Sequence, residues 1–386
     1  MLRIVGGALV WLIVAVGLAL TIVPRFLDRI YVEAAPDEHF DGERFFNPNG
    51  PDTAAPPTGG SRSGFLLRYF SGSDGRPAWP DHVAIRSTRP ATRITGERMV
   101  VTWIGHATVL VQTNGLNILT DPVYAGRAGP LGFGPRRVTP PGVAFDDLPP
   151  IDLVLVSHNH YDHLDKDALH RLYERDRPTI VTSLGNDSVI AQAGAQSIAL
   201  DWGRAVSVRP GVSVAVVRNH HWSSRWFADR NRALWSAFVV RLPSGGNLFF
   251  AGDTGFGDER WPAEAAAYGP VRLALLPIGA FRFAPGQMSS ASHIGPAEAA
   301  LVYQRLGATR ALPIHWGTFR LSYEAYDTPP RMLAAAMRCT GARGFEAAGI
   351  GMPVDVPPAR AIPAPHPMSL AAMLRCLDTP AVRALR

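Results

Sequence analysis

Residues 157–165 read SHNHYDHLD and directly follow the apolar run IDLVLV. His158, His160, Asp162 and His163 fall within six positions, and imidazole nitrogens and carboxylate oxygens are ligands that zinc accepts. Because the preceding run is typical of a strand, we expect these side chains on a loop at its carboxyl end. The chain has 12 histidines in 386 residues, so three in this window favour a metal site over a polar surface loop.

This segment alone supplies too few ligands for two metal ions, so later residues must contribute. Asp253 lies in the segment NLFFAGDTG, directly after its apolar part, and the glycines on either side of it would allow close approach of a metal centre. Taken alone, Asp-Thr-Gly is ordinary turn chemistry, and a lone histidine such as His315 in ALPIHWGTF would be structural. The full set of further candidates is His220, His221, Asp253, His293 and His315.

The central part of the chain alternates strand-like and helix-like segments. From Met99 onward, short runs rich in β-branched residues are separated by turns such as Asn114-Gly115, which is typical of a hairpin. Helix-like stretches occupy residues 165–176, 296–307 and 329–341, the first and last with good helix formers and the last closed by Gly341. This order predicts two packed sheets inside helical layers.

Residues 4–23 form an apolar stretch in which Thr21 is the only polar side chain. At about 1.5 Å per residue, a helix of this length spans a hydrocarbon core of roughly 30 Å, whereas the apolar stretch of a cleaved signal peptide has only about 7–15 residues. We therefore expect a single-pass membrane anchor. Arg3 precedes the stretch and Arg25 and Arg29 follow it, so the side of the membrane stays open. The predicted parts are an anchor (1–23), a Pro/Gly-rich connector (24–98), a hydrolase-type domain (99–355) and a C-terminal tail with a short helix (356–386).

Charge and cysteine content narrow the class of protein. The net charge is +6, but no block of five like charges and no nucleic-acid-binding motif occurs, so no nucleic-acid partner is expected. A mildly basic surface fits an anionic membrane or a phosphorylated substrate. Cys339 and Cys376 have no metal-type spacing and support neither a disulfide framework nor a cysteine zinc site. Any metal must be held by histidine and aspartate.

Together these motifs carry a family resemblance. The order HxHxDH, a later histidine, GDTG and a final histidine resembles the metallo-β-lactamase superfamily. Within about residues 99–350, the chain is similar to the N-acyl-phosphatidylethanolamine-hydrolysing phospholipase D branch of this superfamily. The segments that carry this similarity are TWIGHATVLV, LTDP, SHNHYDHLD, HHWSSR, FFAGDTGFG and PIHWGTF. The resemblance implies an α/β fold of the four-layer αββα sandwich type that holds two Zn²⁺ ions.

The resemblance also implies roles for individual residues. One zinc ion would be bound by His158, His160 and His221, the other by Asp162, His163 and His315, and both by Asp253. His221 is preferred to His220 because the family places tryptophan after this ligand, as Trp222 is here.

Two more histidines match the family. His293 precedes a Pro-x-Glu-Ala helix start and is a candidate catalytic acid or substrate contact, with an exposed helix-start residue as the alternative. His106, in WIGHATVL, is expected to orient a ligand and not to bind metal.

The expected chemistry is hydrolysis. Two divalent cations about 3.5–4 Å apart lower the pKa of a water and neutralise phosphodiester oxygens. Asp162 would bind the second ion and orient the nucleophile. We therefore expect a membrane-anchored di-zinc phosphodiesterase acting on a phospholipid, such as N-acyl-phosphatidylethanolamine, or on another small phosphodiester. A lactonase or other carbon-ester hydrolase, and a membrane-tethered metal-binding protein without turnover, are the alternatives. Iron or manganese also suits this ligand set.

Overall fold

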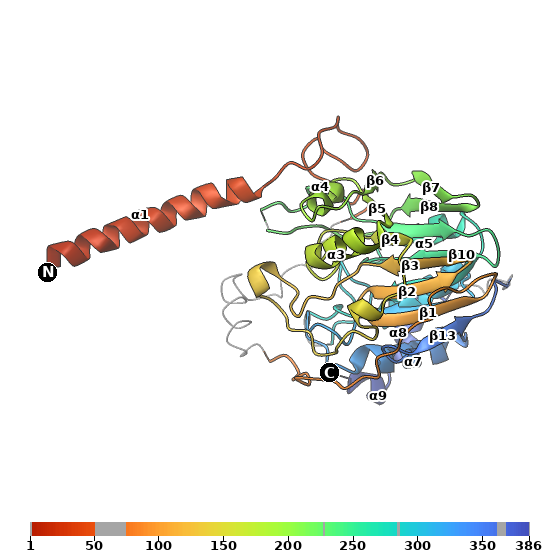
Figure 1. The fold of residues 1–386 in the computed structure, drawn as a ribbon. Helices are drawn as coiled ribbons and strands as arrows, with labels where there is room; N and C mark the ends of the chain where they lie inside the picture. The colour runs from red at the N-terminus through yellow and green to blue at the C-terminus, as the bar shows by residue number, and fades with distance from the viewer. Residues whose placement is uncertain (1, 51–74, 227, 284–285, 361–367, 386) are drawn as a thin grey trace.

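The structure, a computed structural model, describes residues 2–50, 75–226, 228–283, 286–360 and 368–385. Two β-sheets form its centre (Figure 1). The first has the order β13 (Pro353–Val356), β1 (Met99–Gly105), β2 (Thr108–Thr113), β3 (Leu116–Thr120), β4 (Leu153–Val156), β5 (Thr179–Ser183) and β6 (Ile198–Leu200). The second has the order β12 (Arg310–Ile314), β11 (Val271–Pro277), β10 (Asn247–Phe250), β9 (Ala237–Arg241), β8 (Val212–Val217) and β7 (Ala205–Arg209).

Helices cover the outer faces of the two sheets. One apolar cluster lies between the sheets, and alternate residues of β1 (Met99, Val101, Trp103) point into it. A second cluster joins the first sheet to α3 (Lys166–Asp176) and α4 (Asn186–Ala191). A third joins the other sheet to α5 (Trp261–Ala266), α6 (Pro296–Leu306), α7 (Thr328–Thr340) and α8 (Leu370–Leu377). The predicted mixed α/β fold with two sheets is confirmed.

Local sequence signals explain several of these elements. Asn114 and Gly115 both adopt positive φ angles, 50° and 67°, and connect the antiparallel pair β2 and β3 as the hairpin signal predicts. Asp165 caps the start of helix α3, because its carboxylate accepts hydrogen bonds from two backbone N–H groups, and Gly341 caps the end of α7 in the left-handed region. The three predicted helices are therefore all present, with bounds that differ by a residue or so.

The strand directions decide where loops can meet. β3, β4 and β5 run parallel in the first sheet, and β10, β11 and β12 run parallel in the second. Carboxyl ends of parallel strands lie at one edge, which is where open α/β sheets place their ligands. The loops that follow β3, β4, β10 and β12 carry, respectively, Asp121, residues 157–165, Asp253 and His315.

The N-terminal helix α1 (Leu2–Leu27) projects away from the domain (Figure 1). Within it, Gly6–Leu27 has a mean hydropathy of 2.4 and is not buried inside the protein, so by length and composition it is a candidate membrane span.

Residues 28–50, the described start of the predicted connector, pack on the domain. Asp28, directly after α1, pairs with Arg232 at 2.8 Å, and Phe40 and Phe45 are buried against Leu234 and Trp235. The end of α1 is thereby tied to the loop that follows β8. Residues 51–74 of the connector and 361–367 of the tail lie outside the described residues.

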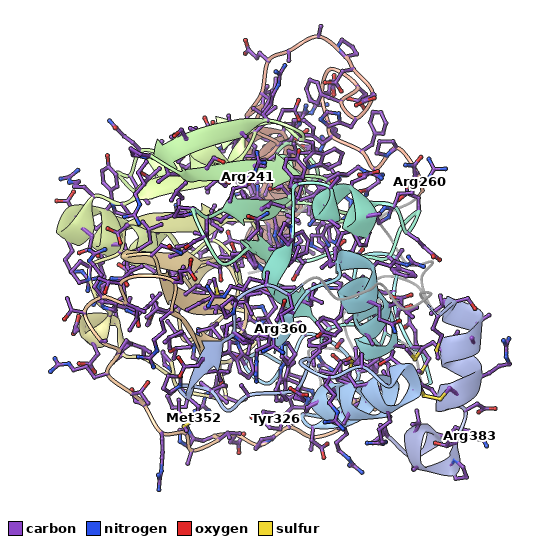
Figure 2. All side chains as sticks on the ribbon, turned by 90° about the vertical axis from the view of Figure 1, so that its right-hand side faces the viewer. Arg241, Arg260, Tyr326, Met352, Arg360 and Arg383 are labelled. Atoms are coloured by element: carbon purple, nitrogen blue, oxygen red, sulfur yellow. A yellow bond between two sulfur atoms is a disulfide. The ribbon has the colours of Figure 1, made fainter. Side chains whose placement is uncertain are left out.

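The two cysteines form a bond that the sequence analysis did not support. Cys339 on α7 and Cys376 on α8 form a disulfide with their Cα atoms 6.0 Å apart (Figure 2). The bond fastens the terminal helices α8 and α9 (Pro380–Arg383) to the domain. The separation of 37 residues carries no local signal, because only the packing of α8 against α7 brings the two thiols together.

Candidate metal centre

Two groups of ligand-type side chains converge at the carboxyl edge of the sheets. In the first, one ligand atom from each of His158, His160, His221 and Asp253 lies within 4.8 Å of all the others. These side chains come from the loops after β4, β8 and β10. The structure thus brings together the set that was assigned by resemblance to one metal ion.

The second group contains His106, Asp162, His163 and His315, which meet the same distance limit. Asp253 reaches this group as well, because its Oδ2 lies 3.1 Å from Nε2 of His163 and 3.0 Å from Nε2 of His315. The same oxygen is 3.8 Å from Nε2 of His221 in the first group. Asp253 is therefore the carboxylate at which both groups meet.

Hydrogen bonds from the surrounding frame fix which ring nitrogen faces the centre. His163 donates from Nδ1 to Oδ2 of Asp121 at 2.6 Å, and His221 donates from Nδ1 to the carbonyl oxygen of Ser292 at 2.9 Å. Each bond leaves Nε2 directed inward, and it is through this nitrogen, without its proton, that each ring would bind a metal ion.

The inward atoms are suited to a cation. Nε2 of His160, Nε2 of His221 and Oδ1 of Asp253 are buried without a hydrogen-bond partner in the part of the chain that the structure describes. Each such atom costs about 1–3 kcal/mol of desolvation unless something binds it. Burial lowers the pKa of His160 to about 3 and holds the pKa of His221 well below its ordinary value. Neutral imidazoles with free nitrogens fit a metal site.

For Asp253 and His163, charged neighbours outweigh the effect of burial on the pKa. Burial alone would raise the pKa of Asp253, but His163 and His315 hold it well below the ordinary value. Burial alone would likewise lower the pKa of His163, yet Asp253, Asp162 and Asp121 together raise it well above the ordinary value. These carboxylates therefore concentrate negative charge at the centre, and a bound cation would neutralise it.

Three residues at this centre have strained backbone conformations. His106, Asp121 and His315 have positive φ angles of 53°, 30° and 64°, which non-glycine residues rarely adopt and which cost about 1–3 kcal/mol each. The backbone N–H of His315 donates to the carbonyl oxygen of His106 at 3.0 Å, so two of these residues support each other. Such strain persists where the surrounding structure imposes it, and it is found most often at functional sites.

The glycines on either side of Asp253 allow the loops to approach one another. A Cβ atom at Gly252 would lie 2.7 Å from Cβ of Ser157, and one at Gly255 would lie 1.8 Å from the carbonyl oxygen of Ala291. The loop after β10 therefore packs against the neighbour of His158 and against the segment that leads to His293.

The remaining histidine candidates differ in whether they adjoin the centre. Nδ1 of His293 is 3.8 Å from Oδ2 of Asp253, and its ring stacks on that of His315 with centroids 5.3 Å apart. It therefore adjoins the centre and is not an exposed helix-start residue. His220 belongs to none of the groups found among the described residues, and its ring packs against Gly257. His106 donates a hydrogen bond from Nε2–H to Oδ2 of Asp162 at 2.9 Å.

The sequence analysis missed two neighbours of the centre. Asp121 is fully buried and, besides its bond to His163, accepts hydrogen bonds from the backbone N–H and hydroxyl of Ser157 at 2.7 and 2.6 Å. The sequence does contain a signal for Asp121, because this residue follows the apolar run LNILT much as Asp253 follows NLFFAG. Asn47 donates to the carbonyl oxygen of His221 at 2.8 Å, and nothing in its Pro/Gly-rich surroundings indicates this contact.

Several known proteins are similar to this chain. The family model described as the β-lactamase superfamily domain matches residues 116–316. N-acyl-phosphatidylethanolamine-hydrolyzing phospholipase D 1 of Caenorhabditis elegans is 35% identical over 269 residues, which cover 65% of this chain and 74% of that protein. The chain belongs to the metallo-β-lactamase superfamily of metal-dependent hydrolases. The predicted resemblance is confirmed.

A further relative and a solved structure are similar to this chain at lower identity. The mitochondrial N-acyl-phosphatidylethanolamine-hydrolyzing phospholipase D of Saccharomyces cerevisiae is 32% identical over 237 residues, covering 60% of this chain and 50% of that protein. Among solved structures, an isothiocyanate hydrolase from Delia radicum gut bacteria matches with a TM-score of 0.52 at 18% identity, covering 66% of this chain and 98% of that one. This last likeness supports the fold.

The contacts of Asp121 generate a prediction. Asp121→Asn keeps the side-chain shape but removes the charge that orients His163, so we expect metal affinity to fall roughly 10- to 100-fold. The measurement is competition with a fluorescent chelator on the full-length protein.

Asp146→Asn is the matched control, because the Asp146 side chain is 93% exposed and belongs to none of the ligand-type groups found among the described residues. The melting temperature of each metal-free variant reports folding separately. Equal metal affinities for Asp121→Asn and the wild type, in proteins of equal melting temperature, would contradict the role of Asp121.

Proposed function

We propose that the protein is a two-metal phosphodiesterase that cleaves phospholipids in the manner of a phospholipase D, with N-acyl-phosphatidylethanolamine as a substrate. The observation that carries this proposal is the meeting of two ligand-type groups at the shared carboxylate of Asp253. Under this proposal, His158, His160 and His221 hold one zinc ion, Asp162, His163 and His315 hold the second, and Asp253 contacts both. A structural zinc site normally has a single closed set of ligands, so a pair of linked sets supports a hydrolase.

Bound divalent cations at this centre would lower the pKa of a water and neutralise the oxygens of a phosphodiester. The residues of the chain provide orientation. Asp162 is 13% exposed, whereas the His163 and His315 side chains are fully buried, so it lies on the accessible side of the second group. Its Oδ2 is held by His106, and Asp162 is thus placed to orient the attacking nucleophile.

His293 is placed to contact the substrate. Its side chain is 12% exposed, and its Nδ1 is buried without a hydrogen-bond partner among the described residues. Burial lowers the pKa of His293 to about 4, so the ring is neutral at pH 7. A neutral imidazole can donate a hydrogen bond to the leaving oxygen of the phosphodiester without carrying a charge of its own.

Relatives and membrane features support a lipid substrate. Two relatives at 35% and 32% identity carry the name of a phospholipase D that hydrolyses N-acyl-phosphatidylethanolamine. Helix α1 has the length and hydropathy of a membrane anchor, and its end is tied through Asp28 and Arg232 to the loop that carries His221. An anchor attached so close to the centre would hold that centre near a bilayer.

Substrate specificity tests this proposal. Full-length protein in detergent micelles, supplied with Zn²⁺, is expected to release phosphatidic acid from N-acyl-phosphatidylethanolamine and to hydrolyse bis(p-nitrophenyl) phosphate. His163→Ala removes a proposed ligand, and its activity should fall by more than the roughly 10- to 100-fold that loss of an outer partner costs. Lipid products are measured by mass spectrometry.

His82→Ala is the matched control, since His82 is exposed and belongs to none of the ligand-type groups found among the described residues. It should retain wild-type turnover. Hydrolysis of lactones together with an absence of phosphodiester turnover would contradict the phosphodiesterase proposal and favour carbon-ester chemistry.

We infer further that the domain lies on the oxidising side of its membrane. Cys376 is exposed, so the Cys339–Cys376 disulfide is accessible to reductants. Disulfides persist in secreted and extracytoplasmic proteins and are rare where glutathione and thioredoxin keep thiols reduced.

Protease access tests this location. In bacterial cells that express the full chain and are converted to spheroplasts, external protease should digest the domain, and both cysteines should resist alkylation until a reductant is added. A domain that is protected from protease, with both thiols alkylated, would contradict the placement.

A further inference from the structure

The loop between β3 and β4 ends in two exposed apolar side chains. Leu131 is 86% exposed and Phe133 is 72% exposed, at the short 3₁₀ turn η1 (Pro130–Gly132). Single exposed apolar residues are common, but two at the tip of one projecting loop indicate a surface that another apolar partner covers. The tip is held closed at its neck, where a Cβ atom at Gly129 or Gly134 would lie 2.2 or 2.3 Å from a backbone oxygen of the opposite side.

Positive charge surrounds this tip. Arg127 and Arg136 are exposed, bridge to each other through their backbones, and line a surface depression of about 450 Å³ with Ala125, Gly126, Gly129 and Gly132. No acidic residue occurs from Pro122 to Phe145, and no carboxylate pairs with either arginine within the described residues. An anion would therefore meet unneutralised guanidinium groups there.

The base of the loop is attached to the two segments that carry His163 and His315, both members of the second group. The carboxylate of Asp165, two positions after His163, accepts hydrogen bonds from the backbone N–H groups of Tyr124 and Ala125 at 3.0 and 2.9 Å. At the other end, the N–H of Val138 donates to the carbonyl oxygen of Thr318, three positions after His315. A rigid base with an apolar, cationic tip is thus presented next to the centre.

The tip and the proposed anchor face the same way. In Figure 1 the turn η1, coloured gold, projects from the side of the domain toward which α1 extends. A bilayer that contains α1 would therefore lie on the side where Leu131 and Phe133 are exposed. Apolar side chains that enter the acyl region and arginines at the level of the phosphates are the combination that binds an anionic membrane surface.

We propose that residues 126–137 form a membrane-docking loop, in which Leu131 and Phe133 insert into the bilayer and Arg127 and Arg136 bind the phosphate groups of anionic phospholipids. This proposal rests on the proposed membrane placement of α1. It adds a second contact that orients the domain, so that the metal centre opens toward the lipid surface.

The native disulfide makes a clean test possible, because both native cysteines are paired. Full-length Leu131→Cys is labelled with the fluorophore NBD and reconstituted into phosphatidylcholine vesicles with or without 30 mol% phosphatidylglycerol. Doxyl-labelled lipids then quench only a fluorophore that enters the acyl region. Met352→Cys is the matched control, since Met352 is 48% exposed and adjoins β13 on the side opposite α1 (Figures 1 and 2).

The expected result is strong quenching at position 131, greater with phosphatidylglycerol, and little at position 352. Adding Arg127→Ala and Arg136→Ala should reduce the effect of phosphatidylglycerol at least about fivefold, with an unchanged melting temperature. Equal quenching at the two positions would overturn the proposal. Quenching at position 131 that changes neither with phosphatidylglycerol nor with the arginine substitutions would overturn it as well. Vesicle flotation reports insertion of α1 separately, and no step depends on hydrolysis.

Discussion

The buried carboxylate of Asp253 constrains everything around it. It is 1% exposed and lies among imidazoles from three other loops, with Oδ2 close to His163, His221 and His315. A charge at this depth is stable only if other groups compensate it. The parallel strands bring those groups to one edge, the glycines beside Asp253 remove steric obstacles, and the surrounding structure holds the backbone of His106, Asp121 and His315 in its strained conformation.

This centre is connected to the N-terminal part of the chain by polar contacts. Asp28 pairs with Arg232 and Asn47 holds the backbone of His221, so residues just beyond α1 contact the loop that supplies a proposed ligand. The loop at Leu131 is connected in turn to Asp165 and Thr318, which follow His163 and His315 in the chain. Proposed membrane contacts and proposed chemistry thus share one rigid frame, and this suits an enzyme whose substrate is part of the membrane.

Much of this could be read from the sequence. The segment SHNHYDHLD, the glycines around Asp253 and the Asn114-Gly115 hairpin are local signals, and the structure shows the expected fold around them. Contacts between distant residues were not readable. Asp121 was passed over because it stands alone after its strand, the Cys339–Cys376 disulfide depends on helix packing, and Asn47 lies in a segment whose composition suggested a loose connector. Each depends on tertiary proximity, which no local pattern encodes.

The central claim is that two cations share Asp253, and anomalous diffraction from crystals grown with Zn²⁺ tests it most directly. Data collected at the zinc absorption edge should show two peaks roughly 3.5–4 Å apart, one beside His158, His160 and His221 and the other beside Asp162, His163 and His315. A single peak, or peaks that are not adjacent to Asp253, would contradict the shared centre and the proposed hydrolysis with it.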